Sequence, residues 1–362
     1  TIGGADQDIL SKVIQTSDGG YLLGGRSESD ISGDKTENSN GGFDYWIVKL
    51  NSSGTIVWQN TIGGSDIDRF NDLIETSDGG DLVAGHSTSG ISGDKTQANN
   101  GTYNFWIVKL NGAGVIQWDQ TIWGYQIDVI GLVHESSTGD FLIGGYSNSG
   151  AAGDKSEASQ GDFDYWLVKL NSNGSLLWEK TIGGDDVDEV HALRETNTGN
   201  FIVAGTSISG VSGDKTQASV GYDFWILEID PSGTIQWQKT IGGAGSDKLY
   251  QLDTISNGYL ISGASDSNTG GDKSDDSYGG KDYWMVKTDL NGNVVKDYTF
   301  GGTDEDELIA AFELSSSSHV LVGFSQSNSN AIKDENSLGA SDYWIFKADC
   351  IALDAPVASE ID

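Results

Sequence analysis

The sequence predicts an all-β fold, a six-bladed β-propeller with four antiparallel strands in each blade. Two observations predict it: one unit repeats six times at a nearly constant step, and each unit reads as four short strands without a helix. Four-stranded repeats of this length are typical of propellers, and the alternative is an open β-solenoid, whose repeats are usually shorter. The repeat begins at Thr1, Thr61, Thr121, Thr181, Thr240 and Thr299, in steps of 60, 60, 60, 59 and 59 residues.

The first two strands of the repeat are expected at residues 8–15 and 21–27. The first, DILSKVIQ, ends at the turn Ser17–Gly20, and the second, YLLGGRS, is mostly apolar and rich in small residues. Gly, Asp and Ser at this break supply the positive φ angles and local hydrogen bonds that a tight turn requires. The two strands therefore read as a hairpin.

The other two strands are expected at residues 44–50 and 55–62. The third, DYWIVKL, carries an aromatic–Trp pair, and the turn Asn51–Gly54 separates it from the fourth, TIVWQNTI. Because the pair recurs in every repeat, we expect its tryptophans to be buried between neighbouring blades, and the same holds for Trp58 and its equivalents. The tryptophans of the pair are Trp46, Trp106, Trp166, Trp225, Trp284 and Trp344.

The repeats cover residues 1–349, which we take as one propeller domain. The sixth repeat lacks the fourth-strand pattern, and the chain begins with the end of that pattern, TIGG. We therefore expect Thr1–Gly4 to lie beside Tyr343–Lys347 on the outer edge of the last blade. Residues 350–362 match nothing in the repeat, and they are expected to form a C-terminal linker or tail.

The composition argues against several classes of partner. The chain has 362 residues and a formal net charge of −34, with 54 acidic residues against 20 Lys and Arg. Such a chain repels nucleic-acid phosphates and anionic membrane surfaces and attracts cations. No apolar run approaches the roughly 20 residues needed to cross a bilayer. We therefore expect neither nucleic-acid binding nor direct membrane insertion.

The repeat resembles a propeller-repeat family found in surface and secreted proteins of Bacteroidetes. The motifs that carry the resemblance are T-I-G-G-x-x-x-D, T-S-D-G-G-[YD]-L and D-Y-W-I-V-K-L-N-x-x-G-x-I-x-W, and the match covers all six repeats. Proteins of this type are often cargo of the type IX secretion system. The resemblance implies an extracellular or cell-surface location, and a monomeric domain within a larger secreted protein or assembly.

The two ends of each predicted blade differ in loop length. The hairpin turns at one end are short, whereas the blade-to-blade connection and the long loop of residues 28–42 leave the sheet at the other end. Loops carry function more often than the scaffold does, so we expect binding at this long-loop face. Because acidic residues concentrate there, the face is expected to favour neutral or cationic partners.

Two carboxylates recur at this end of the repeat, one seven residues after the repeat's Thr and one in a Gly-Asp-Lys motif. A third acid or amide, Asp44 in the first repeat, precedes the aromatic–Trp pair. The recurring aspartates are expected to cap backbone N–H groups or to pair with the loop lysine, which would pin the long loop. The alternative is a Ca²⁺ ion in each blade, and no organic cofactor is expected. These residues are Asp8, Asp34, Lys35, Asp68, Asp94, Asp128, Asp154, Asp188, Asp214, Asp247, Asp272 and Asp306.

A unique ligand site in a symmetric protein is expected where the repeat is broken. The breaks occur at the end of the second strand, at one position of the first strand, and at an aromatic insertion in the third repeat. Aromatic rings beside hydrogen-bonding groups suit sugars, which present an apolar face and hydroxyls, and the alternative is unselected drift. The candidate ligand-binding residues are Arg26, His86, Trp123, Tyr125, Tyr146, His191 and Tyr250.

The sequence predicts a binding module and not an enzyme. It holds no paired-His zinc motif, G-x-S-x-G elbow or phosphate loop. The arginines Arg26, Arg69 and Arg194 stand at three different repeat positions, so a sialidase-like arginine cluster is not expected. We expect an extracellular module for adhesion, glycan binding or protein interaction through the long-loop face. The alternatives are a structural spacer or cap of a larger surface assembly and, third, a glycoside hydrolase-like propeller.

Overall fold

The computed structural model describes residues 1–329, 332–349 and 357–360, and every regular element in them is a β-strand. The strands form six sheets of four antiparallel strands, the blades of a β-propeller, which confirms the predicted fold class. Across these residues no helix has the length and apolarity that crossing a membrane requires. The chain divides into two compact units, residues 1–183 and 184–362.

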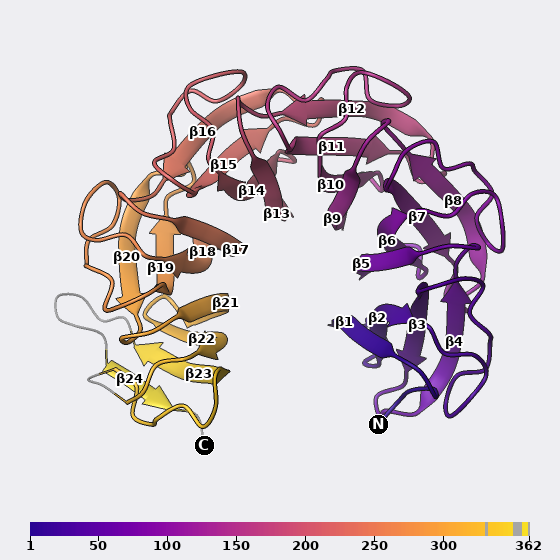
Figure 1. Cartoon of the computed structure of the whole chain (residues 1–362), viewed down its shortest axis with the longest axis horizontal. Helices are drawn as coiled ribbons and strands as arrows, with labels where there is room; N and C mark the ends of the chain where they lie inside the picture. Colours follow the sequence, from indigo (N-terminus) through magenta and orange to yellow (C-terminus); the bar gives the residue numbers. More distant parts are fainter. Residues whose placement is uncertain (330–331, 350–356, 361–362) are drawn as a thin grey trace. The chain divides into compact units, whose positions relative to one another are not determined.

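Unit 1 contains the first three sheets (Figure 1). The strands of each sheet lie in chain order, so each sheet is a simple meander. The first strands β1, β5 and β9 contact one another in succession along one side of the unit, and β4, β8 and β12 lie along the opposite side (Figure 1). The strands are β1 (Asp8–Gln15), β2 (Tyr21–Ser27), β3 (Asp44–Leu50), β4 (Ile56–Ile62), β5 (Asp68–Glu75), β6 (Asp81–Ser87), β7 (Asn104–Leu110), β8 (Ile116–Ile122), β9 (Asp128–Glu135), β10 (Phe141–Ser147), β11 (Asp164–Leu170) and β12 (Leu176–Ile182).

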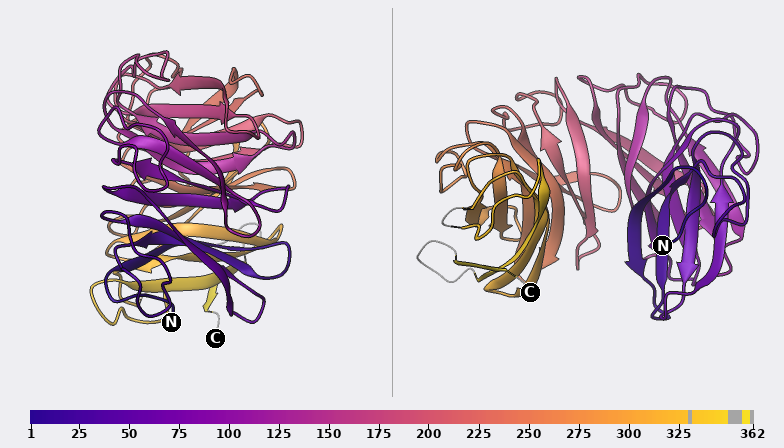
Figure 2. Two further views of the ribbon diagram at one scale, coloured as in Figure 1. Left: turned by 90° about the vertical axis from the view of Figure 1, so that its right-hand side faces the viewer. Right: turned by 60° about the horizontal axis from the view of Figure 1, so that its bottom comes forward.

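Unit 2 contains the other three sheets, again as meanders in which the first strands β13, β17 and β21 are in contact. Figure 2 shows how the strands of each sheet twist relative to one another. The strands are β13 (Asp188–Glu195), β14 (Phe201–Ser207), β15 (Asp223–Ile229), β16 (Ile235–Ile241), β17 (Asp247–Ile255), β18 (Gly258–Ser265), β19 (Asp282–Thr288), β20 (Val294–Phe300), β21 (Asp306–Ser315), β22 (Ser318–Ser325), β23 (Asp342–Asp349) and β24 (Val357–Glu360).

The aromatic–Trp pair joins successive sheets within each unit. The Tyr45 hydroxyl donates to the Trp106 carbonyl oxygen at 3.2 Å, and the two ring centroids lie 5.0 Å apart. In unit 2, Phe224 and Trp284 repeat the ring contact at 4.8 Å. All six tryptophans of the pair are buried, with exposed fractions between 0% and 8%, as the sequence predicts.

The second set of tryptophans lies at the rim of the core and not inside it. Trp58, Trp118 and Trp237 are only half-buried, which corrects the expectation that they are core residues. Each ring covers a turn of the next sheet: a Cβ added to Gly114 would meet Trp58 at 2.7 Å, and one added to Gly174 would meet Trp118 at 2.8 Å. The edge position of the fourth strand leaves the other side of these rings in solvent.

The last sheet obtains its fourth strand from the C-terminal end of the chain. β24 pairs antiparallel with β23 over Phe346–Asp349. The expectation that residues 350–362 form only a linker is therefore wrong for 357–360, and the remaining residues of that segment lie outside the described part. Thr1–Gly4 forms no strand, and β24 occupies the Phe346–Lys347 part of the edge that the sequence assigned to it. Strand pairing depends on backbone hydrogen bonds, so a four-residue strand without a repeat motif leaves no sequence signal.

Candidate functional site

The long loops lie against the connections between sheets, and both leave the sheet at the same end. The Gly3 N–H donates to Asp34 Oδ2 at 3.1 Å, and the Gly3 carbonyl accepts from the Asp34 N–H at 2.9 Å. Gly63 and Asp94 repeat both contacts at 3.2 Å and 2.9 Å in the second sheet. The equivalent carboxylates Asp154 and Asp272 accept from backbone N–H groups at 3.1 Å and 3.2 Å, and the Asp214 carbonyl accepts from Gln238 at 2.6 Å.

The second recurring carboxylate holds the next N–H group of the same connection. Asp68 is fully buried, and its Oδ2 accepts from the Gly64 N–H at 2.7 Å and from the Ser89 hydroxyl at 3.0 Å. Of the two partners expected for these aspartates, the structure shows backbone N–H groups. The same N–H contact holds Asp8 at 2.6 Å, Asp128 at 2.6 Å, Asp188 at 2.8 Å, Asp247 at 2.7 Å and Asp306 at 2.7 Å.

The Oδ2 atoms of these carboxylates could hold a cation only by exchanging hydrogen bonds that they already make, whereas Oδ1 of Asp68 and of its equivalents Asp188, Asp247 and Asp306 is buried without a hydrogen-bond partner. The Oδ2 atoms face N–H and O–H donors, and an N–H group cannot turn to become a calcium ligand. Among the residues that the structure describes, no three His, Cys, Asp or Glu side chains gather as a candidate metal site. The local chemistry is that of loop pinning, and removal of calcium by a chelator tests the calcium alternative.

Each loop lysine holds its loop against its own sheet. Lys95 is buried, its Nζ lies 5.3 Å from the centroid of the Trp106 ring, and it donates to the Thr121 hydroxyl. Burial lowers the pKa of Lys95 to about 8. Lys35 is also buried and donates to the Glu37 carbonyl at 2.8 Å. The lysine thus contacts an aromatic ring, hydroxyls and carbonyls, in place of the expected ion pair with its neighbouring aspartate.

A further buried carboxylate lies where two sheets of unit 1 meet. Asp44 begins β3, and the Asp68 N–H donates to the Phe43 carbonyl at 2.6 Å, so the two aspartates are neighbours. Asp44 is fully buried and its Oδ1 has no hydrogen-bond partner. Burial raises the pKa of Asp44 to about 7, against the Asn40 N–H, which lowers it. Asn104 replaces this aspartate in the second sheet, so a neutral group is accepted at the position.

The variable position of the first strand is a β-bulge in every sheet. In β5, Phe70 pairs with Gly85 and Asp72 pairs with Ala84, so Asn71 has no partner residue in the register. A bulged residue is outside the ladder, which explains why this position varies between repeats. The bulged residues are Ser11, Asn71, Gly131, His191, Tyr250 and Ile309.

Two of the predicted ligand-binding residues lie in one cluster of unit 1, with three residues that the sequence did not single out as a site. We call Arg26, Phe43, Arg69, His86 and Tyr103 the arginine cluster. Arg69 lies directly opposite His86 in the register of β5 and β6, and β2, which carries Arg26, contacts β5. The Arg26 guanidinium lies 5.1 Å from the Phe43 ring centroid, and that of Arg69 lies 5.9 Å from Tyr103. His86 meets Tyr103 edge-on at 5.2 Å.

The arginine cluster is a cationic exception in an acidic chain. Burial, followed by the charges of Arg69 and Arg26, lowers the pKa of His86 to about 4, so its imidazole is neutral at pH 7. Arg194, in contrast, donates to Asp253 at 2.7 Å. Arg26 and Arg69 lie close to the same imidazole although they occupy different repeat positions. The antiparallel register of β5 and β6 could have placed Arg69 opposite His86 from the sequence, whereas the position of Arg26 depends on the packing of β2 on β5.

The other predicted residues of unit 1 form two aromatic contacts. Tyr146 meets Phe163 edge-on at 5.4 Å, the same arrangement that His86 makes one sheet earlier. Trp123 and Tyr125 lie 5.3 Å apart, and Tyr125 is 63% exposed. Aromatic side chains at the ends of these sheets are therefore partly available to a ligand.

The two predicted residues of unit 2 make polar contacts within their own surroundings. The Tyr250 hydroxyl donates to Glu307 Oε2 at 2.6 Å, and burial together with this bond raises the pKa of Tyr250. His191 Nε2 lies 3.9 Å from Glu189 Oε2, and burial lowers the pKa of His191 to about 4. Both residues occupy bulges, so each is placed by its own strand and not by a shared pocket.

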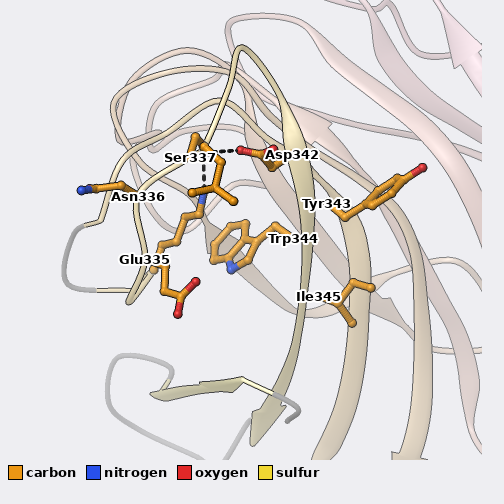
Figure 3. Close-up of a pocket in the computed structure, with 9 residues that line it drawn as sticks. Glu335, Asn336, Ser337, Asp342, Tyr343, Trp344 and Ile345 are labelled. Atoms are coloured by element: carbon orange, nitrogen blue, oxygen red, sulfur yellow. Dashed lines mark hydrogen bonds between the residues drawn. The ribbon is translucent and has the colours of Figure 1, made fainter.

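A pocket opens beside Trp344, at the edge of the last sheet (Figure 3). Tyr343 and Ile345 project from one side of β23, and Trp344 projects from the other (Figure 3). In the first sheet the fourth strand pairs Thr61 with Trp46, whereas β24 ends at Glu360, opposite Phe346. The pocket is therefore the place that the fourth strand fills in the other sheets, and it needs no small ligand to explain it.

No family model matches the chain. It is 28% identical to the regulatory protein FlaEY of Caulobacter vibrioides over 183 residues, which are 48% of this chain and 19% of that protein. The chain thus spans less than a fifth of that relative. Similar solved structures include a protein of unknown function from Dyadobacter fermentans, with 13% identity, coverage of 94% of this chain and 95% of that chain, and a TM-score of 0.49. Another is the PQQ-bound aldose sugar dehydrogenase of Streptomyces coelicolor, with 11% identity, coverage of 96% and 95%, and a TM-score of 0.45.

Proposed function

We propose that this chain is a non-enzymatic, extracellular or cell-surface module that binds a glycan through the long-loop end of its blades. The supporting observation is a contrast at that end of unit 1. Its repeated Asp, Ser and Lys side chains are engaged in pinning loops, whereas its non-repeated side chains are aromatic or cationic. Repeated residues thus build the scaffold, and non-repeated residues supply the contacts.

The pinned loops favour binding because they are already ordered. Asp68 and Asp94 each accept a backbone N–H of the connection that the loop touches. A loop held in this way loses little conformational entropy when a ligand arrives. The end of the blade therefore offers a rigid surface on which a few side chains decide what binds.

The side chains on this surface have the chemistry of sugar recognition. Tyr125 is 63% exposed beside Trp123, and Tyr146 lies against Phe163. An aromatic ring covers the apolar face of a sugar, and its polar neighbours bond the hydroxyls. A protein partner and a purely structural spacer are the other functions that the experiment must separate from glycan binding.

A glycan-array screen of the purified chain, with and without calcium, tests the proposal. We expect a defined subset of glycans to bind, and we expect Tyr125→Ala or Tyr146→Ala to weaken that binding. Val115→Ala is the matched control, because Val115 is 58% exposed in the same unit but follows a short hairpin turn. An array without any signal, or a signal equally reduced by the control, would refute glycan binding at this end.

A further inference from the structure

Two arginines of the chain hold buried N–H donors without a protein acceptor. Arg26 Nε and Arg69 Nε are both inaccessible to solvent and have no hydrogen-bond partner within the described residues. His86 Nδ1, in the same cluster, is also buried and unpartnered. A buried donor that lacks an acceptor is costly, and the cost is larger on a charged group. The cluster therefore holds hydrogen-bonding groups that no described residue satisfies.

Arginine side chains without an acidic partner are unexpected in a chain with so many acidic residues. The chain carries 54 acidic residues and three arginines, Arg26, Arg69 and Arg194. Arg194 is paired with one of these acidic residues, since its Nε and Nη2 both donate to Asp253 Oδ1, at 3.0 Å and 2.7 Å. Arg26 and Arg69 instead lie over the Phe43 and Tyr103 rings, which leave the edges of the guanidinium groups to other partners.

The geometry of a guanidinium selects its acceptor. Its N–H groups form a planar fork that matches the two oxygens of a carboxylate. His86 adds a neutral imidazole beside the fork, because its pKa of about 4 keeps it uncharged at neutral pH. The two cations and the neutral imidazole together suit one carboxylate with a neighbouring polar group.

The net charge of the chain further restricts which carboxylate ligands could bind to the cluster. With a net charge of −34, the protein repels a polyanion such as an acidic peptide, whereas one carboxylate on a neutral body meets little of that repulsion. In the neutral His86 ring one of the two nitrogens is an acceptor, and Nδ1 has no partner. A sugar hydroxyl can donate to such an acceptor, and a simple carboxylate ion cannot.

We propose that the arginine cluster binds the carboxylate of a sugar acid, a uronic acid unit within a glycan. This inference rests on the proposed glycan-binding function and names the ligand class for that function. Arg26 and Arg69 bind the carboxylate oxygens, and His86 contacts a neighbouring hydroxyl.

Nuclear magnetic resonance of the three arginine Nε–H groups tests the inference directly. The full chain, labelled with ¹⁵N-arginine, is titrated with methyl β-D-glucuronide, and its neutral counterpart methyl β-D-glucoside is the matched probe. We expect the Arg26 and Arg69 resonances to shift with the glucuronide and not with the glucoside. The Arg194 resonance is an internal control and should stay in place, because Asp253 already pairs with that side chain. A response of all three resonances, or an equal response to the glucoside, would overturn the proposal.

Three variants then measure the contribution of the fork. Arg69→Gln should weaken glucuronide binding at least about tenfold, as expected for the loss of a charge-assisted hydrogen bond. Arg69→Lys keeps the charge and the stem over Tyr103 but lacks the fork, and it should also bind more weakly. Arg194→Gln should bind as the unchanged chain does. Denaturation midpoints check that each variant is folded, and full affinity in folded Arg69→Gln would reject the cluster as the site.

Further probes separate this inference from the proposed function. If acetate binds as tightly as the glucuronide, the site recognises carboxylates without a sugar, and the sugar-acid assignment is overturned. If an acidic peptide binds more tightly than the glucuronide through Arg69, the partner is a protein. If the glycan array shows only neutral glycans that depend on Tyr125 or Tyr146, this inference fails while the proposed function stands. A silent array together with a silent titration would reject both.

Discussion

Single buried carboxylates show how a residue can couple stability to pH. Burial raises the pKa of Asp44 to about 7, compared with an ordinary value of 3.8. Between these pH values the folded chain keeps a proton that the unfolded chain has lost. The folded state therefore binds more protons, and the contribution of Asp44 to stability falls as the pH rises through this window.

Asp44→Asn isolates this effect, since Asn104 already occupies the equivalent position of the second sheet. We expect the variant to gain stability relative to the unchanged chain between pH 5 and pH 8, by up to about 1.4 kcal/mol for each pH unit. Buried histidines such as His319 titrate in both proteins, so their contribution cancels. Urea denaturation at several pH values measures the difference. Asp18→Asn is the control, because Asp18 is exposed and a Thr16 hydrogen bond lowers its pKa, and an equal gain there would refute the account.

The recurring carboxylates at the long-loop end lead to a prediction about calcium and stability. Asp68 already accepts hydrogen bonds from Gly64 and Ser89. We therefore expect the melting temperature of protein purified with calcium to be unchanged when a chelator is added. A cation bound only by the folded state would stabilise it by mass action. A lower melting temperature that calcium restores and magnesium does not would establish the calcium alternative.

Trp58, Trp118 and Trp237 of the fourth strands β4, β8 and β16 each pack on a turn of the next sheet. Gly114 lies in the turn before β8 with a φ of +76°, and the Trp58 ring covers it. Gly54 occupies the same turn position one sheet earlier with a φ of +80°, but nothing lies within 4 Å of a Cβ added there. The two glycines thus share a backbone conformation and differ in one packing contact.

Substitution of these two glycines separates backbone strain from packing. Gly54→Ala should cost about 1–2 kcal/mol, because an L-residue is strained in the left-handed region. Gly114→Ala should cost a further ~1–3 kcal/mol, because the added methyl displaces the Trp58 ring. Chemical denaturation of both variants gives the comparison. Equal losses would show that the tryptophan does not constrain the turn.

For the whole molecule, the excess of negative charge is the dominant electrostatic feature. The net charge is −34, so acidic groups repel one another more in the compact state than in the unfolded chain. Ion pairs such as Lys12–Asp72 at 2.9 Å and Lys109–Asp78 at 3.0 Å offset only a small part of this repulsion. Salt at physiological strength screens such interactions beyond about 8 Å.

The melting temperature should therefore rise as NaCl is increased from low to physiological concentration. KCl should produce the same rise, because screening depends on ionic strength and not on the identity of the cation. Differential scanning calorimetry in both salts measures the effect. A melting temperature that falls with salt would mean that ion pairs outweigh the general repulsion.

Repetition made much of the fold readable from the sequence. The expected strands at 8–15, 21–27 and 44–50 coincide with β1, β2 and β3, and the fourth differs from β4 by one residue. The buried tryptophans were equally readable, because the same chemistry recurs in each unit. Arg26 and His86 were found as candidates because they break that recurrence, although their ligand remains a prediction.

Tertiary structure decided what the repeat does not contain. β24 lies outside the repeat, and its pairing with β23 depends on backbone hydrogen bonds that any residues can make. Arg26 and Arg69 lie 43 positions apart in the chain, and only the packing of β2 on β5 and the register of β5 with β6 bring both to His86. The repeated residues are those that make the same contacts in every blade. Contacts between unlike positions depend on register and packing, which appear only once the chain is folded.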